Sequence, residues 1–434
     1  FKCYDSLMDS IRRILNYTPK TKIYYGWIVL LTASLGTFAC TGVSQQTIVA
    51  IQTIMLTETG WDRTQFALGI STGTWIVGFL TPIFGRLADK YGPRFIMPFA
   101  MIVLGICFYI IGGANSIWTF YFGYIIARGL GTPILVSSMP RNVAVNFFFR
   151  KRNLAMGFVF MARPFYAAGN IQLISNWISS WRTGYRILGL YAFVVAIPMV
   201  MILRKSPESI GLLPDGRLPS NESRTSISNN LSANEVSWKV SEAMKTNTFW
   251  YICLTQFLAI TVLGTIGFQT VPYLNDTGLS LSIAVLAWTL ASLMDSVFNP
   301  ICGFLADRYT PRKVYFVVLP LTLIVTSLFL LVDGGMMGFI VVLLWAAASG
   351  GLEVLGSMLT ANYYGRNSFG AISGVVGSFQ IGGLGVGPTL AALLSKVFVS
   401  YKPIFALCVL MYLVALIFLL LSKKPIYINP SDSE

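Results

Sequence analysis

Histidine is absent from this sequence, and charged residues are scarce. Charged side chains make up 11% of the 434 residues, less than half the share that soluble domains carry. Without histidine, the usual side chain for proton exchange near neutral pH is missing, so any proton must be carried by carboxylates. The six cysteines include no CxxC pair, which argues against a zinc site or a disulfide framework. We expect no metal site.

Two enzyme motifs are also missing. The chain has neither an HExxH metal-binding motif nor a GxxxxGK[ST] phosphate-binding loop. Zinc-dependent peptidase chemistry and direct drive by ATP are therefore excluded. We assign no catalytic residue and expect a protein that is not an enzyme and has no cofactor.

Hydrophobic residues, in contrast, account for 55% of the chain, and the mean hydropathy is +0.68. They gather in runs of about 20 residues, the length that an α-helix needs to cross a bilayer. We expect an all-α integral membrane protein with twelve transmembrane helices in two pseudo-symmetric six-helix bundles. The predicted spans are 24–49, 65–85, 95–113, 117–140, 154–178, 183–203, 249–272, 281–305, 314–332, 336–360, 370–396 and 402–422.

Charge between the apolar runs predicts the domain organisation. Basic residues concentrate in the N-terminal segment, the even-numbered loops and the tail, which the positive-inside rule assigns to the cytoplasm. The net charge of +14 therefore indicates topology, and we expect no nucleic acid as a partner. The predicted parts are a cytoplasmic segment 1–23, an N-terminal bundle 24–203, a cytoplasmic linker 204–248, a C-terminal bundle 249–422 and a cytoplasmic tail 423–434.

An internal repeat relates the two halves. Thr81–Arg94 (TPIFGRLADKYGPR) matches Asn299–Arg312 (NPICGFLADRYTPR) at nine of fourteen positions. Both copies follow the second predicted span of their half. Two parallel repeats are a known design of transporters, with the solute site at their interface near the middle of the membrane.

Together with the twelve spans, this repeat makes the chain resemble the major facilitator superfamily of transporters. Gly85–Arg94 is similar to the family's signature between spans two and three, and Arg128–Gly131 (RGLG) is similar to its second motif. The resemblance covers essentially the whole chain. It implies that the two bundles rock against each other and so give the solute site alternating access.

Three segments resemble one branch of that superfamily, the monocarboxylate transporters and oxalate/formate exchangers. They are Tyr25–Trp27 (YGW), Phe149–Gly157 (FRKRNLAMG) and Asp295–Pro300 (DSVFNP). The chain departs from the branch at Asn299, where an Arg is common. The resemblance implies a small organic anion as solute, but the cation that binds it must lie elsewhere in this sequence.

Arg163 is the candidate for that cation. It lies about 15 Å along its predicted span, because an α-helix rises 1.5 Å per residue, and an ionisable group at this depth is costly and usually functional. Its planar guanidinium can donate two parallel hydrogen bonds to a carboxylate. The alternative is a structural ion pair of Arg163 with Asp295 or Glu353.

Asp295 and Glu353 are the candidates for proton coupling, because both stand deep in predicted spans. Desolvation favours the neutral carboxylic acid and a nearby Arg favours the anion. A carboxylate that meets Arg in only one conformation would therefore load and release a proton. The alternative is a carboxylate that is permanently paired.

Amide side chains within the spans are further candidates for binding the solute. Asn299 lies one helical turn from Asp295 on the same face. Gln380 occupies the position of Arg163 in the second half, and Gln45 and Gln269 belong to polar stripes of the first and seventh spans. Each alone is more often a bond between helices.

The charged residues of the repeated motifs are candidates for gating. Asp89 and Asp307 stand where a carboxylate can meet a helix N-terminus or a neighbouring Arg, and Arg94 and Arg312 are the nearest basic residues of the motifs. Such contacts would close the cytoplasmic side and break when it opens. Arg128 belongs to the motif that the resemblance links to gating and helix packing.

The leading interpretation is a secondary active transporter that moves a small organic anion, such as a monocarboxylate, in symport with protons. We expect it to act as a monomer in the plasma membrane, surrounded by lipid, with both termini in the cytoplasm. One alternative is a transporter of a neutral or cationic compound. Another is a transporter-like membrane receptor that binds a solute without moving it.

Overall fold

The computed structural model describes residues 24–174, 180–210, 212, 215, 238–332, 334–366, 368–398 and 400–425, and every regular element among them is helical. The chain divides into two compact units. Unit 1 contains residues 1–150 and 166–229, and unit 2 contains residues 151–165 and 230–434. The predicted segment 1–23, most of the predicted linker and the end of the predicted tail lie outside the described residues.

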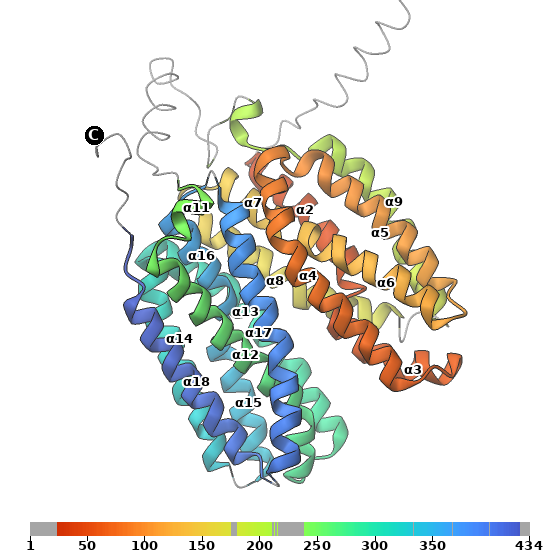
Figure 1. Cartoon of the computed structure of the whole chain (residues 1–434), viewed down its shortest axis with the longest axis vertical. Helices are drawn as coiled ribbons and strands as arrows, with labels where there is room; N and C mark the ends of the chain where they lie inside the picture. The colour runs from red at the N-terminus through yellow and green to blue at the C-terminus, as the bar shows by residue number, and fades with distance from the viewer. Residues whose placement is uncertain are drawn as a thin grey trace, which may run out of the picture. The chain divides into compact units, whose positions relative to one another are not determined.

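Helices that run side by side build unit 1 (Figure 1). The bounds of its elements are α2 Tyr25–Thr41, α3 Gln45–Thr59, α4 Arg63–Tyr91, α5 Pro93–Gly112, α6 Ile117–Gly131, the π-helix η1 Thr132–Ser138, α7 Met139–Phe147, α9 Trp181–Ile202 and the 3₁₀-helix η3 Pro207–Ile210. Helix α8, Arg152–Gln172, contributes only its last residues to this unit.

Unit 2 contains the rest of α8 and the helices that follow the linker. Their bounds are α11 Val240–Ala243, α12 Asn247–Asp276, α13 Leu281–Tyr309, α14 Pro311–Leu328, the 3₁₀-helix η5 Phe329–Leu331, α15 Gly335–Ser349, α16 Leu352–Tyr364, α17 Phe369–Val397 and α18 Lys402–Leu421.

Ten helices in the described part of the chain are long and apolar enough to cross a membrane. The described residues of the fourth and fifth predicted spans are helical but are not among these ten. In the fourth, Pro133 and Pro140 lack an amide hydrogen, and the helix passes through a π-helical segment between α6 and α7. In the fifth, polar residues such as Arg163 and Asn170 interrupt the apolar run of α8.

The repeated signature is mostly helical, which corrects the prediction of a loop. No helix-breaking conformation occurs before Gly92, so α4 continues to Tyr91 and ends where Gly92 adopts φ +72°. Pro93 then begins α5, since proline at the first helical position lacks only an amide that has no helical partner. In the second copy, Thr310 takes the equivalent place at φ +79°, and Pro311 begins α14.

Two predicted spans are broken helices. In the first, α2 ends at Thr41, and Ser44 caps α3 by accepting a hydrogen bond from the Thr47 amide. In the tenth, α15 ends at Ser349 and α16 begins at Leu352. Gly351 between them has φ +113°, and a Cβ there would lie 2.5 Å from the sulfur of Cys302. This break therefore requires glycine.

Glycines allow close packing inside each unit. In unit 2, a Cβ on Gly383 would lie 2.5 Å from the carbonyl oxygen of Phe257, so α17 and α12 meet backbone to backbone. In unit 1, Gly105 of α5 and Gly189 of α9 face one another in the same way. Small residues permit such approach in membrane helices.

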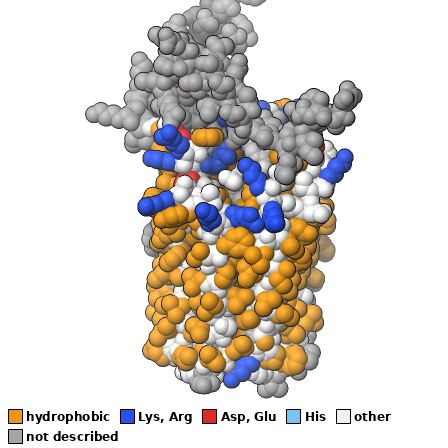
Figure 2. Space-filling view, turned by 90° about the vertical axis from the view of Figure 1, so that its left-hand side faces the viewer, with side chains coloured by type: hydrophobic (Ala, Val, Ile, Leu, Met, Phe, Trp, Pro, Cys, Tyr) orange, Lys and Arg blue, Asp and Glu red, His pale blue; other side chains and the backbone are white. Residues whose placement is uncertain are grey.

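The surface agrees with a protein that spans a bilayer. Large apolar side chains are exposed, among them Phe79, Trp118 and Val317. On the face shown in Figure 2, hydrophobic side chains cover most of the surface and basic side chains gather towards one end. Lipid can cover such an apolar surface, whereas a soluble monomer rarely exposes one.

Candidate functional site

The centre of the candidate site is an ion pair between Arg163 and Glu353 within unit 2. The Nη1 atom of Arg163 donates to Oε1 of Glu353 at 3.1 Å, and Nη2 donates to Oε2 at 2.7 Å. The Arg163 side chain is 40% exposed and that of Glu353 is 19% exposed. This parallel geometry is the one by which arginine recognises carboxylates, and the Arg163 side chain as a whole stays partly exposed.

The broken tenth span positions Glu353. Because α16 begins directly after Gly351, Glu353 falls in its first turn. The first amide groups of a helix lack helical partners and carry partial positive charge, which favours a carboxylate there. The break also packs on α13, since a Cβ on Gly350 would lie 3.1 Å from the Cα atom of Asp295.

Asp295 is the second carboxylate of the site. Its charge lies close enough to interact with those of both Arg163 and Glu353. One turn later on α13, the Asn299 amide donates to the Asp295 carbonyl oxygen at 2.7 Å. The structure thus brings together four of the predicted residues, and their ionised groups add up to one positive and two negative charges.

Helix α13 also supports the helix that carries Arg163. The carboxylate of Asp307 accepts hydrogen bonds from the amides of Asn153 and Leu154, each at 3.0 Å, at the start of α8. A Cβ on Gly157 would lie 2.7 Å from the Cα atom of Pro300. These contacts fix α8 against α13 and set where Arg163 stands.

Gln380 lies behind the ion pair and is 4% exposed. Its Nε2 atom donates to Oε1 of Gln256 at 2.9 Å and to the carbonyl oxygen of Glu353 at 3.3 Å. Sequence reasoning missed Gln256, which is fully buried in α12. The sequence did contain a signal for Gln256, because an amide side chain within an apolar run needs a hydrogen-bond partner inside the membrane.

Arg128 lies in unit 1 and is 7% exposed. Its Nη1 atom donates to the carbonyl oxygen of Val43 at 2.9 Å, and its Nη2 atom lies 3.4 Å from the hydroxyl of Thr74. Val43 belongs to the break between α2 and α3. Arg128 therefore joins three elements of unit 1 through uncharged partners.

The other predicted gating residues occupy separate places. In unit 1, Asp89 accepts a hydrogen bond from the amide of Asn142 at 3.1 Å, and the guanidinium of Arg94 lies over the ring of Phe95. In unit 2, Arg312 donates to the carbonyl oxygen of Leu420 at 3.3 Å.

Two further predicted solute ligands belong to other elements. Gln45 is the first residue of α3 and belongs to unit 1. Gln269 is buried in α12. In the polar stripe that contains Gln45, Thr37 donates to the carbonyl oxygen of Leu135, and the Asn170 amide donates to the hydroxyl of Thr41. These two contacts of the stripe are bonds between helices of unit 1.

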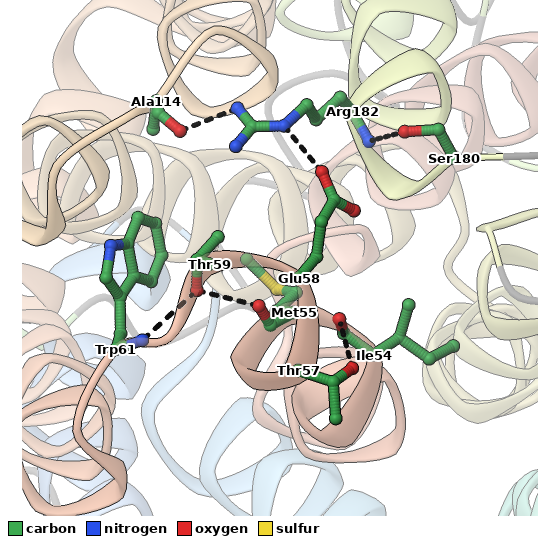
Figure 3. Close-up of polar contacts among 9 residues, drawn as sticks. All are labelled: Ile54, Met55, Thr57, Glu58, Thr59, Trp61, Ala114, Ser180 and Arg182. Carbon is green, nitrogen blue, oxygen red and sulfur yellow. Dashed lines mark hydrogen bonds and ion pairs between the residues drawn. The ribbon is translucent and has the colours of Figure 1, made fainter.

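A second ion pair fixes α3 in unit 1 and was not predicted. Figure 3 shows the guanidinium of Arg182 between Glu58 and Ala114. Its Nε atom donates to Glu58 at 2.9 Å, and its Nη1 atom donates to the carbonyl oxygen of Ala114 at 2.6 Å. Both charges lie at helix ends on predicted outer loops, so their pairing depends on how the helices pack.

Comparisons with known proteins agree with this architecture. The Major Facilitator Superfamily profile matches residues 28–294 and 252–433. The chain is 22% identical over 256 residues to the glycerol-3-phosphate transporter of Haemophilus influenzae, covering 53% of this chain and 52% of that protein. It is 24% identical over 250 residues to the oxalate:formate antiporter of Oxalobacter formigenes, covering 56% and 55%. The chain thus spans about half the length of these curated relatives.

Solved structures show the same fold. The transporter FucP in its outward conformation aligns with a TM-score of 0.70 and 13% identity, covering 92% of this chain and 100% of that one. The proton:xylose symporter XylE aligns with a TM-score of 0.68 and 13% identity, covering 92% and 96%. The family profile confirms the resemblance to the major facilitator superfamily drawn from the sequence motifs. The chain belongs to the Major Facilitator Superfamily.

Proposed function

We propose that this protein is a secondary active transporter that moves a small organic anion together with protons. The proposal rests on one observation, the bidentate hydrogen bonding between Arg163 and the carboxylate of Glu353. The Glu353 carboxylate occupies the place that a carboxylate of the solute would take. Since 40% of the Arg163 side chain is exposed, we propose that a solute reaches its guanidinium.

Protonation of Glu353 is the step that couples the two movements. A neutral carboxylic acid binds a guanidinium less strongly than a carboxylate does, so a proton on Glu353 releases Arg163. The carboxylate of the solute then accepts the same two hydrogen bonds. When the solute leaves, Glu353 loses its proton and pairs with Arg163 again.

The charge of the site supports coupling of one proton to one monoanion. With Arg163, Glu353 and Asp295 ionised, the net charge is −1. After a proton binds Glu353 and a monoanion binds Arg163, the net charge is again −1. Constant charge matters because each change of charge within a bilayer is costly. Asp295 is the proposed second proton carrier and serves when the solute carries two charges.

Amide residues complete the proposed solute site. Asn299 uses its Nδ2 atom within α13, and its side-chain carbonyl is the proposed acceptor for a hydroxyl of the solute. Gln269, Gln45 and Gln380 stay proposed ligands from the sequence, although the amide nitrogen of Gln380 is committed to Gln256 and Glu353.

The charged residues of the repeated motifs are proposed to control the conformation. Asp307 holds the start of α8, so release of this contact would free the helix that carries Arg163. Asp89, Arg94, Arg128 and Arg312 are the other proposed gating residues. We further propose a monomer in the plasma membrane with both termini in the cytoplasm.

The names of the relatives support an anion but also keep a second candidate open. Glycerol 3-phosphate, oxalate and formate, which name the two curated relatives, are anions. The solved structures include a fucose:proton symporter and a proton:xylose symporter, whose sugars are neutral. A neutral or cationic solute would use Asp295 and Glu353 as its ligands, and the excess of carboxylates in the cluster favours this candidate.

Uptake by the purified full chain in sealed vesicles, with an imposed pH gradient, tests the proposal. The labelled panel contains lactate, pyruvate, formate, oxalate, an amino acid, a sugar and a lipophilic cation. We expect gradient-driven entry of a carboxylate that is lost in Arg163→Gln. Entry of only neutral or cationic compounds would contradict the role of Arg163, and binding without flux would indicate a receptor.

A further inference from the structure

Behind the ion pair, three buried side chains of unit 2 form a network that ends on the first turn of α16. Gln256 of α12, Tyr315 of α14 and Gln380 of α17 are 0%, 1% and 4% exposed. The Nε2 atom of Gln256 lies 3.0 Å from the hydroxyl of Tyr315 and donates to the carbonyl oxygen of Leu352 at 3.1 Å. Three helices are thus tied to the start of a fourth.

Gln380 extends the network to Glu353 itself. Its Nε2 atom donates to Oε1 of Gln256 and to the backbone carbonyl of Glu353. The amide of Gln256 can lie there because residue 356 is glycine, and a Cβ at Gly356 would occupy the place of that amide. Hydrogen bonds to two successive carbonyls, Leu352 and Glu353, fix the rotation of the first turn.

We propose that Gln256 and Gln380 are positioning residues that hold the carboxylate of Glu353 on Arg163 and thereby set the pH at which the pair opens. This role rests on the proposed function, in which Glu353 takes up a proton. The first turn of α16 needs such support because Gly350 and Gly351 separate it from α15. Glycine permits many backbone conformations, so contacts from side chains help to define the turn that follows the break.

The groups that face Glu353 come from several helices. Arg163 of α8 pairs with it directly, and Asp295 of α13 adds a negative charge nearby. Cys302 of α13 donates to the Gly350 carbonyl at the break, at 3.4 Å. Helix α14 contributes Tyr315 through Gln256, and α12 and α17 contribute uncharged amides. The network therefore acts on Glu353 through geometry and adds no charge.

Carbodiimide labelling of Glu353 tests this inference without relying on transport. Dicyclohexylcarbodiimide reacts with a protonated carboxyl group. Its nitrogen takes up the proton, and its central carbon forms a bond to the carboxyl oxygen. The product then rearranges to an N-acylurea, with no group lost. The full chain in lipid nanodiscs would be labelled over a range of pH, and mass spectrometry of the peptide with Glu353 would give the pH of half-maximal labelling. Glu353→Gln shows the background.

Gln256→Met and Gln380→Met remove the donors and keep the side-chain length. Each weakens the contact of Glu353 with Arg163, so we expect the labelling midpoint to rise by roughly half to one pH unit, the equivalent of one lost hydrogen bond. Thr322→Val is the matched control. It removes a buried donation, at 2.8 Å, to the carbonyl of Ala348 on the α15 side of the same break, and we expect no shift.

An unchanged midpoint in both methionine variants would overturn the inference. Two other results would do the same: an equal shift in Thr322→Val, or wild-type labelling that does not depend on pH. If the midpoint shifts as expected but the wild type takes up no anion in vesicles, the positioning role stands and the proposed function fails. The two failures are therefore distinguishable.

Discussion

Each unit contains a broken spanning helix, and side chains of opposite charge occupy the two breaks. In unit 1 the break between α2 and α3 receives Arg128, which donates to the Val43 carbonyl just beyond the end of α2. In unit 2 the break between α15 and α16 carries Glu353 in the first turn of α16. Arg128 lies at the C-terminal end of a helix, which favours cations, and Glu353 lies at the N-terminal end of another, which favours anions.

Arg128 and Arg163 have different kinds of partner: Arg128 meets neutral groups, whereas Arg163 meets a carboxylate. Arg128 is 7% exposed, and its Nη1 and Nη2 atoms meet a carbonyl and a hydroxyl, which keep the same charge at any physiological pH. Arg163 is accessible and meets a carboxylate, which a proton can neutralise. We infer that Arg128 stabilises the fold of unit 1, whereas Arg163 exchanges one carboxylate partner for another.

Arg163→Gln is expected to have the largest effect on transport. Hydrogen bonds to charged groups contribute about 1.5–3 kcal/mol, which corresponds to roughly a 10- to 100-fold loss of affinity for a carboxylate. Initial rates of uptake in vesicles over a range of solute concentrations measure this loss. Arg163→Lys keeps the charge without the planar fork, so a partial loss is expected.

The double variant Arg163→Gln with Glu353→Gln provides the control. It removes both members of the ion pair together, so neither is left without the other, and we expect near wild-type thermal stability and no coupled uptake. Uptake with wild-type affinity in either variant would show that Arg163 is a structural residue like Arg128.

Arg128→Gln is expected to lower stability and to leave the solute affinity little changed. It removes the donation to Val43 and leaves buried acceptors without their charged donor, which costs about 1–3 kcal/mol in the free energy of unfolding. Thermal unfolding in detergent and the KM for uptake would measure the two effects. A rise in KM equal to that of Arg163→Gln would remove the distinction between the two breaks.

Exchange of residues between the repeated motifs sharpens the comparison of the units. Thr310 has φ +79°, a region that disfavours β-branched residues. We expect Thr310→Gly to raise the free energy of unfolding by about 1 kcal/mol. Gly92→Thr should lower it, because a Cβ there would also lie 2.8 Å from the Cβ of Lys205. Denaturation midpoints measure both changes. A rise for Thr310→Gly with a fall for Gly92→Thr is the expected result, and changes of the same sign would contradict the expectation.

Arg182→Gln is expected to have the smallest effect. Its pair with Glu58 is partly exposed, at 24% and 43% for the two side chains, and such pairs contribute about 0–1 kcal/mol. The loss of the pair with Glu58 should loosen α3, which faster hydrogen exchange of its amides would reveal. Arg186→Gln, an exposed change one turn later on α9, is the control and should leave α3 unaffected.

Several features of the molecule were predictable because they depend on local patterns. The spans follow from apolar runs of about 20 residues. The fold class follows from the repeat around Asp89 and Asp307. The break at Gly351 was not predicted, because a glycine pair in an apolar helix is more often a packing contact.

The pairing of charges was decided by the tertiary structure. The sequence left Arg163 with either Asp295 or Glu353 as its partner, and the structure selects Glu353 for the direct contact. It also adds Gln256, which connects positions far apart in the chain.

The sequence by itself determined that this chain spans a membrane as two related halves, because hydrophobicity and repeats are properties of short segments. Only the tertiary structure decided which carboxylate pairs with Arg163 and which neutral groups accept hydrogen bonds from Arg128. The physical reason is that the energy of a charge inside a bilayer depends on the atoms within a few ångströms of it. For Arg163, those atoms come from residues 190 positions away.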